Sequence, residues 1–200
     1  MGKGVLWMGK IFLAVVLPGI FLLSGPAFCA EFSADMHMTS PGGEFDGKIY
    51  VKGDMQRQEG TRMGEKFVTI IRLDKGVLWN LMTGQKMYME TVIPENSQND
   101  PNMQENVKDM AEIRKLGEET VNGYKCEKYE YVFHDKSKGT MTQWIGKDLG
   151  YPVKMVHSGG IVIDYKNIKT GKIADSFFEI PAGYQKFQMP GMPGGMKFPR

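Results

Sequence analysis

Short runs rich in Val, Ile, Phe, Tyr and Trp, each ended by a turn signal, fill the chain from residue 32 to residue 91. The turn signals are Pro41-Gly42-Gly43, Gly53-Asp54, Asp74-Lys75-Gly76 and Thr83-Gly84. This pattern predicts an antiparallel meander of hairpins, because glycine adopts the positive φ that tight turns require. Strand signals resume from residue 118 to residue 168, with breaks that include Asn122-Gly123. They predict a second meander of about four or five strands.

One segment between the two meanders has helical rather than strand spacing. Its apolar residues at that spacing are Met103, Val107, Met110 and Ala111. Asp100 suits the N-cap, Pro101 the first helical position and Gly117 the helix end. We therefore predict one helix over residues 101–115, packed on the concave side of a strongly curved antiparallel sheet. A closed barrel and a sandwich are alternative arrangements of the same strands.

Residues 1–30 have the pattern of a secretory signal peptide. Lys3 and Lys10 precede an apolar stretch, residues 11–23, and small residues follow it. The stretch is shorter than the roughly 20 apolar residues that a membrane-spanning helix needs. We therefore expect export to the bacterial periplasm and cleavage at the end of this segment. A retained membrane anchor and a lipidated Cys29 are the alternatives.

The charge balance after cleavage argues against nucleic acid as a partner. Removing Lys3 and Lys10 from the 25 Lys and Arg leaves 23, which equals the 23 Asp and Glu. Binding to phosphates needs a clustered excess of basic residues, and none is present. Of the two cysteines, cleavage leaves Cys126. We therefore expect no internal disulfide, and stability has to come from packing.

The sequence has no motif that brings catalytic groups together. It contains no serine elbow, no paired-cysteine metal motif, no zinc-protease helix and no phosphate-binding glycine loop. The histidines, His37, His134 and His157, are scattered and are interpreted as surface or turn residues. We therefore expect a non-enzymatic protein without catalytic residues, a metal site or a cofactor.

Methionine is unusually frequent, with sixteen residues, of which Met1 and Met8 lie in the signal segment. Flexible, polarisable methionines suit an apolar surface that adapts to ligands of different shape. Ordinary core filling is one alternative, and copper(I) binding through thioethers is another. The copper interpretation rests on Met189, Met192 and Met196, with Met36-His37-Met38 as a second cluster. The first three lie in residues 188–200, a Pro- and Gly-rich segment that we predict to be a disordered tail.

Three stretches resemble the LolA-like superfamily of periplasmic lipoprotein carriers. They are Gly47-Lys48-Ile49-Tyr50-Val51-Lys52-Gly53, Asp74-Lys75-Gly76-Val77-Leu78-Trp79-Asn80-Leu81 and Phe178-Glu179-Ile180-Pro181-Ala182-Gly183-Tyr184. The resemblance covers residues 45–187. It implies that residues 31–187 form an open half-barrel of antiparallel strands with an apolar cavity. The chain lacks the N-terminal helix that such carriers usually have before the first strand.

The resemblance implies two further expectations. Arg57 lies near the position of a lid-contacting arginine in the carriers, the alternative being a solvated strand arginine. The protein is expected to be a monomeric periplasmic carrier of a lipid, an acyl chain or another apolar ligand, and envelope proteins are possible partners. The candidate lining residues are Ile49, Val51, Trp79, Leu81, Met87, Met89, Trp144 and Met155. The alternative is an envelope interaction or structural module with a filled core and no cavity.

Overall fold

The computed structural model describes residues 31–62, 64–93 and 110–187. The strands are β1 (Glu31–Ser40), β2 (Gly43–Lys52), β3 (Met55–Arg62), β4 (Glu65–Arg72), β5 (Val77–Met82), β6 (Met87–Val92), β7 (Ala111–Val121), β8 (Tyr124–Phe133), β9 (Thr140–Gly146), β10 (Tyr151–His157), β11 (Ile161–Thr170) and β12 (Gln185–Lys186). Three short 3₁₀ helices accompany them: η1 (Leu73–Lys75), η3 (Lys136–Lys138) and η4 (Asp175–Phe178). Within these described ranges, no helix is long and apolar enough to span a bilayer.

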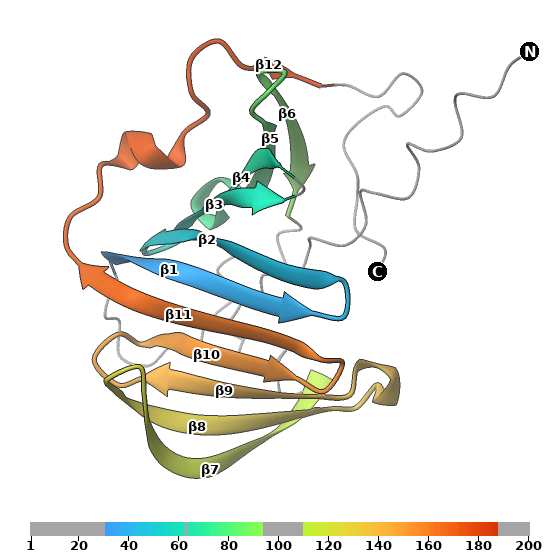
Figure 1. The fold of residues 1–200 in the computed structure, drawn as a ribbon, viewed down its shortest axis with the longest axis vertical. Coiled ribbons are helices and arrows are strands. Elements are labelled where there is room, and N and C mark those ends of the chain that lie inside the picture. Colours follow the sequence, from blue (N-terminus) through green and yellow to red (C-terminus); the bar gives the residue numbers. More distant parts are fainter. Residues whose placement is uncertain (1–30, 63, 94–109, 188–200) are drawn as a thin grey trace, which may run out of the picture.

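All the described strands belong to one sheet, ordered β12-β6-β5-β4-β3-β2-β1-β11-β10-β9-β8-β7 (Figure 1). Each strand runs antiparallel to its neighbours, except that β12 runs parallel to β6. β1 pairs with β2 on one side and with β11 on the other, so the two predicted meanders meet along β1. The end strands β7 and β12 do not pair with each other in the described part of the chain. The prediction of a mainly β protein with an antiparallel sheet is confirmed, and the sheet is open.

The predicted helix is wrong where the structure can test it. Residues 111–115 belong to β7 and pair with β8 along its length. Ala111 is buried, Glu112 is exposed and Ile113 is half-buried, which is the alternation of a strand with one covered face. Gly117 does not end a helix, but has φ +130° where the pairing shifts register. Residues 101–109 lie outside the described residues.

The pairing register divides the side chains between two faces of the sheet. Residues directly opposite each other in paired antiparallel strands point to the same face. One row across β2 to β6 contains Tyr50, Arg57, Ile70, Trp79 and Glu90. We call the face that carries this row the strap face, because the segment 171–187 crosses it.

The opposite face is called the apolar face. One row on it crosses β1, β11, β10, β9 and β8 and contains Met38, Ile163, Met155, Gln143 and Tyr129. A second row crosses β2 to β6 and contains Ile49, Gln58, Thr69, Asn80 and Met89. The two rows lie on the same face because Met38 pairs with Phe45, which shares the strand parity of Ile49.

The C-terminal segment 171–187 packs on the strap face of the first meander (Figure 1). Phe178 is fully buried among Val68, Ile70, Trp79 and Leu81. The segment ends in β12, where Gln185 N donates to Lys86 O over 2.9 Å and Phe187 N donates to Tyr88 O over 2.8 Å. The uninterrupted burial of residues 68–72 in β4 follows, because this strand is covered on both faces.

Candidate functional site

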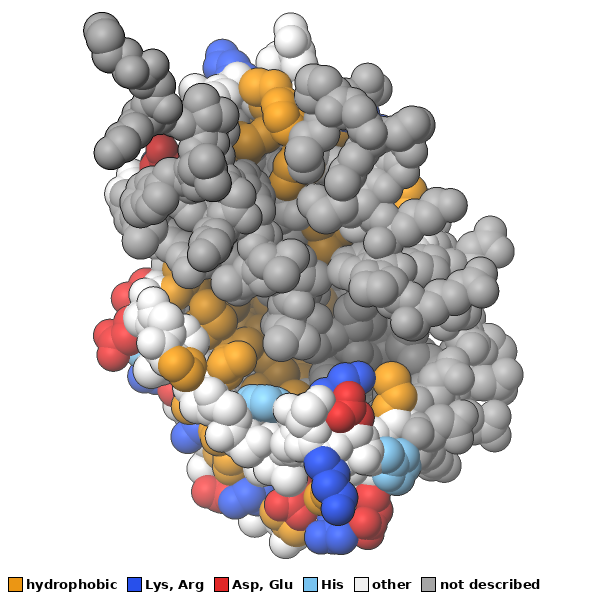
Figure 2. All heavy atoms as spheres, turned by 90° about the vertical axis from the view of Figure 1, so that its right-hand side faces the viewer, with side chains coloured by type: hydrophobic (Ala, Val, Ile, Leu, Met, Phe, Trp, Pro, Cys, Tyr) orange, Lys and Arg blue, Asp and Glu red, His pale blue; other side chains and the backbone are white. Residues whose placement is uncertain are grey.

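The apolar face is continuous across the centre of the sheet. Its largest buried cluster joins side chains of β1, β2, β10 and β11. The members are Phe32, Ala34, Met36, Phe45, Ile49, Val51, Met155, Ile163 and Tyr165, and Met38 packs against them. Seen from the right-hand side of Figure 1, hydrophobic side chains are visible near the top and in the middle of the molecule, and most of the charged ones lie lower (Figure 2). Apolar side chains of this kind are those that line the sites of apolar ligands.

The register distributes the eight predicted lining residues over both faces of the sheet. Five share the apolar face: Ile49, Val51, Met87, Met89 and Met155. Three lie on the strap face: Trp79, Leu81 and Trp144. The first five are a coherent group, whereas no single cleft can be lined by all eight.

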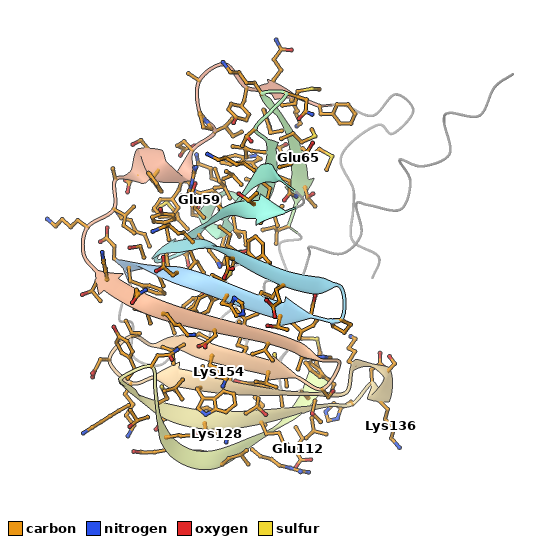
Figure 3. The ribbon with its side chains drawn as sticks, in the orientation of Figure 1. Glu59, Glu65, Glu112, Lys128, Lys136 and Lys154 are labelled. Carbon is orange, nitrogen blue, oxygen red and sulfur yellow. The ribbon has the colours of Figure 1, made fainter. Side chains whose placement is uncertain are left out.

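The strap-face members of the list have structural contacts of their own. Trp79 and Leu81 pack beneath the C-terminal segment, and Trp79 Nε1 donates to Glu90 Oε2 over 3.0 Å. Trp144 donates from Nε1 to Glu119 Oε2 over 2.8 Å. Lys128 Nζ lies 4.8 Å from the centroid of the Trp144 ring and Lys154 Nζ lies 5.3 Å from it. Both lysines stand on this same side of the second meander (Figure 3).

Arg57 contacts the C-terminal segment and is not a solvated strand residue. Its side chain is 14% exposed. Nη1 donates to the Phe177 carbonyl over 3.1 Å, and the guanidinium carbon lies 4.8 Å from the centroid of the Phe177 ring. The neighbouring Glu59, labelled in Figure 3, accepts from Arg57 Nη2 over 3.4 Å. Arg57 therefore fastens the segment 171–187 to the strap face.

Sequence reasoning missed the polar groups that lie within the apolar face. Gln143 is 0% exposed, and Thr69 donates from Oγ1 to Asn80 Oδ1 over 2.9 Å. Burial raises the pKa of Tyr131 and of Tyr165, so both phenols stay neutral even well above physiological pH. The buried part of the apolar face thus presents neutral polar groups, and its ion pair of Lys115 with Glu127 lies at the exposed edge. No sequence signal marks Gln143, because an isolated glutamine in a strand normally points to solvent.

A polar hollow of about 420 Å³ opens beside β1, β2 and β11. It is lined by Asp35, Met36, His37, Asp46, Gly47, Lys166 and Asn167. His37 Nδ1 lies 2.7 Å from Asp46 Oδ1, and His37 Nε2 lies 3.4 Å from Thr39 Oγ1. The order hydroxyl, imidazole and carboxylate is that of a nucleophile relay. The Asp46 side chain is 84% exposed, however, so water screens its charge.

The copper(I) interpretation does not hold for the Met36-His37-Met38 cluster. Met36 and Met38 lie on the apolar face, whereas His37 pairs with Asp46 on the strap face. Neighbouring strand residues point to opposite sides, so the three cannot converge on one ion. Within the described ranges, no three His, Cys, Asp or Glu side chains form a group that could hold a metal. Met189, Met192 and Met196 lie outside the described residues.

The open antiparallel sheet of the protein is a fold that it shares with MucB. The chain belongs to the DUF4412 family, described as a domain of unknown function, whose profile matches residues 32–150. A comparison with curated protein sequences gives no match.

Solved structures of similar fold share little sequence with the chain. An uncharacterized conserved protein from Thermus thermophilus has a TM-score of 0.59 and 14% identity, with 80% of this chain and 91% of that chain covered. MucB, in the Pseudomonas aeruginosa MucA/MucB complex, has a TM-score of 0.52 and 16% identity, with 76% and 56% covered. A LolA superfamily protein from Nitrosomonas europaea has 12% identity and a TM-score of 0.36, with 76% and 91% covered. At these identities, the first two matches show the fold alone.

Proposed function

We propose that the protein is a periplasmic binding or carrier protein that holds a lipid, an acyl chain or a similar apolar ligand on the apolar face. The observation that carries the proposal is the continuity of this face across β2, β1, β11 and β10. Export is inferred from the signal pattern of residues 1–30. The proposal assigns the protein no catalytic step, and its unit of function is the monomer.

The side chains of the apolar face suit a ligand of variable shape. Met36 and Met155 are buried in the central cluster, Met38 packs against it, and Met141 lies in the neighbouring cluster with Tyr131. Thioether side chains bend around irregular apolar surfaces at a small cost in rotamer energy. An acyl chain, which has many conformers of similar energy, matches such a surface better than a rigid ring system does.

Native mass spectrometry of protein purified from the periplasm tests this proposal, together with uptake of a fluorescent fatty acid. We expect co-purified lipid, or uptake that Met155→Gln weakens about tenfold, since the substitution puts a polar group on the binding face. The matched control is Val156→Thr, one residue along β10 and pointing to the strap face, which should alter uptake less than about twofold. A lipid-free protein that also takes up no fatty acid would contradict the proposal.

A second candidate function is a protein-binding module of the cell envelope. MucB, which has a similar fold, is seen in a complex with MucA. In that case the apolar face would be filled by side chains or by a partner segment, and lipid would neither co-purify nor compete. Capture of an envelope protein by the wild type but not by Met155→Gln, without lipid uptake, would favour this function.

A further inference from the structure

The amide of Gln143 is a buried polar group in the middle of the apolar face. The residue is 0% exposed, and no hydrogen-bond partner among the described residues reaches its Oε1 atom. It is flanked in its row by Met155 on β10 and Tyr129 on β8. An acceptor left without a donor in such a place costs free energy, so its presence there requires an explanation.

Two thioethers fix the direction in which this oxygen points. Gln143 Nε2 donates to Met155 Sδ over 3.4 Å and to Met141 Sδ over 3.8 Å. Thioether sulfur accepts hydrogen bonds but cannot donate them. If the amide were flipped, its oxygen would face two sulfur acceptors and its NH₂ group would lose both hydrogen bonds. The amide is held with its nitrogen toward the sulfurs and its oxygen available to accept.

The surroundings of Gln143 Oε1 determine which kind of hydrogen-bond donor could bind to it. The hydroxyl of Tyr129 is already used, because it donates to Glu127 Oε2 over 2.6 Å. An anionic head group would bring further acceptor oxygens against Oε1. An ammonium group would lose its hydration shell in exchange for a single amide dipole. A neutral group with an N–H or O–H bond has neither disadvantage.

We infer that the ligand of the apolar face is an amphiphile whose head group is neutral and donates a hydrogen bond to Gln143 Oε1. A long-chain amide or alcohol has this chemistry. The inference rests on the proposed function, since it names the ligand class of the same face. The apolar chain lies along the methionine-rich rows, and the donor selects among chains of equal length.

Decanamide and methyl decanoate are suitable probes, because they have the same acyl chain and a carbonyl, but the ester has no donor. Calorimetric titration of the full mature chain should give a Kd about tenfold lower for the amide than for the ester. Gln143→Met should bind both probes with the Kd that the wild type has for the ester. It should also raise the Tm of the ligand-free protein, because the buried amide oxygen is removed.

The control variant is Thr142→Val, which is nearly isosteric and points to the strap face from the adjacent position of β9. It should keep the preference for the amide. Equal binding of the two probes by the wild type would overturn this inference and leave the proposed function standing, as would a preference that survives in Gln143→Met. Binding of neither probe would overturn both. The wild-type comparison decides even where a variant fails to fold.

Discussion

The two meanders are parts of one sheet, yet their strap faces are covered differently. In the first, β2 to β6, the segment 171–187 covers this face and buries Phe178 completely. In the second, β7 to β11, the same face carries ion pairs such as Lys128 with Glu119 and Arg114 with Glu112. The strap face of the first meander is thus covered by a segment from the end of the chain, whereas that of the second buries a smaller cluster around Cys126, Trp144, Leu149 and Val153 from its own strands and turns.

The burial patterns of β4 and β7 show the same difference between the two meanders. β4 is buried without interruption from Val68 to Arg72, because both of its faces are covered. β7 alternates more buried with exposed residues from Ala111 to Arg114 and is mostly exposed from Lys115 to Thr120, because it lies at the edge of the sheet. The choice between continuous and alternating apolar residues therefore indicates whether a strand has a cover on each side.

Replacing Phe178, which anchors the segment 171–187 to the first meander, should have the largest effect on stability. Phe178→Ala is expected to lower the free energy of unfolding by about 3–5 kcal/mol, the usual cost of emptying a large buried aromatic site. Phe177→Ala is the matched control, because Phe177 is 37% exposed and contacts Tyr50 and Arg57 near the surface. Urea unfolding of both variants measures the difference. Equal losses would show that the exposed contacts of the segment hold it as firmly as the buried Phe178 does.

Arg72 links the segment to the sheet and gives the next largest effect. It is 6% exposed and donates to Asp74 over 2.7 Å and 2.6 Å, and it also pairs with Glu179. Arg72→Met should cost about 3 kcal/mol in urea unfolding, because Asp74 loses the guanidinium that pairs with it and Glu179 keeps only Lys75.

The second meander offers a comparison pair of the same sequence separation. Arg114 pairs with Glu112 two residues away, as Arg72 does with Asp74, but its side chain is 51% exposed. Water screens exposed pairs, so Arg114→Met should leave the urea midpoint unchanged within error. A midpoint shift as large as that of Arg72→Met would remove the proposed contrast between the two halves.

The ion pair of Arg72 with Asp74 predicts that acid lowers the free energy of unfolding. The hydrogen bond from Arg72 holds the pKa of Asp74 below its ordinary value. A lowered folded-state pKa adds stability that is complete above the unfolded-state pKa, about 3.9, and is lost as the pH falls through the folded-state pKa. Urea unfolding between about pH 5 and about pH 2 should therefore show a steeper loss in the wild type than in Arg72→Met. Parallel curves would mean that Asp74 does not contribute.

The smallest effect is expected from the exposed cations over Trp144. Lys154→Met removes one of the two ammonium groups near the ring and should cost about 0.5–1 kcal/mol. The control is Lys136→Met, which should have no effect, because Lys136, labelled in Figure 3, lies in the exposed helix η3. Thermal unfolding followed by tryptophan fluorescence distinguishes the two. A loss several times larger would show that the stem of Lys154 is part of the packing around Trp144 rather than a weak exposed contact.

The strands could be predicted from the sequence because turn residues act locally. Asn122 and Gly123, for example, both have positive φ, as a two-residue hairpin turn requires. The helix prediction failed at Ala111 and Ile113 because pairing with β8 outweighs a local helical spacing. Local spacing does not reveal a strand partner that lies further along the chain.

The candidate site could be predicted only in part. Strand parity groups Trp79 with Leu81 and Met87 with Met89, but it does not say which pair shares a face with Ile49. That answer depends on the register of β4, which is apolar on both sides. Gln143 gave no signal at all, since its burial results from the strands on either side of it.

The position of β1 in the middle of the sheet sets a limit on how early the protein can fold. A chain that emerges N-terminus first can form β1 and β2 as a local hairpin, but the other edge of β1 waits for β11. Asp35 and Asn167, which bond across this join, are 132 residues apart in sequence. Contacts of such separation slow folding and leave an unpaired strand edge exposed to other chains. A chain caught before this join closes is therefore a target for aggregation and for proteases, whatever ligand the finished protein binds.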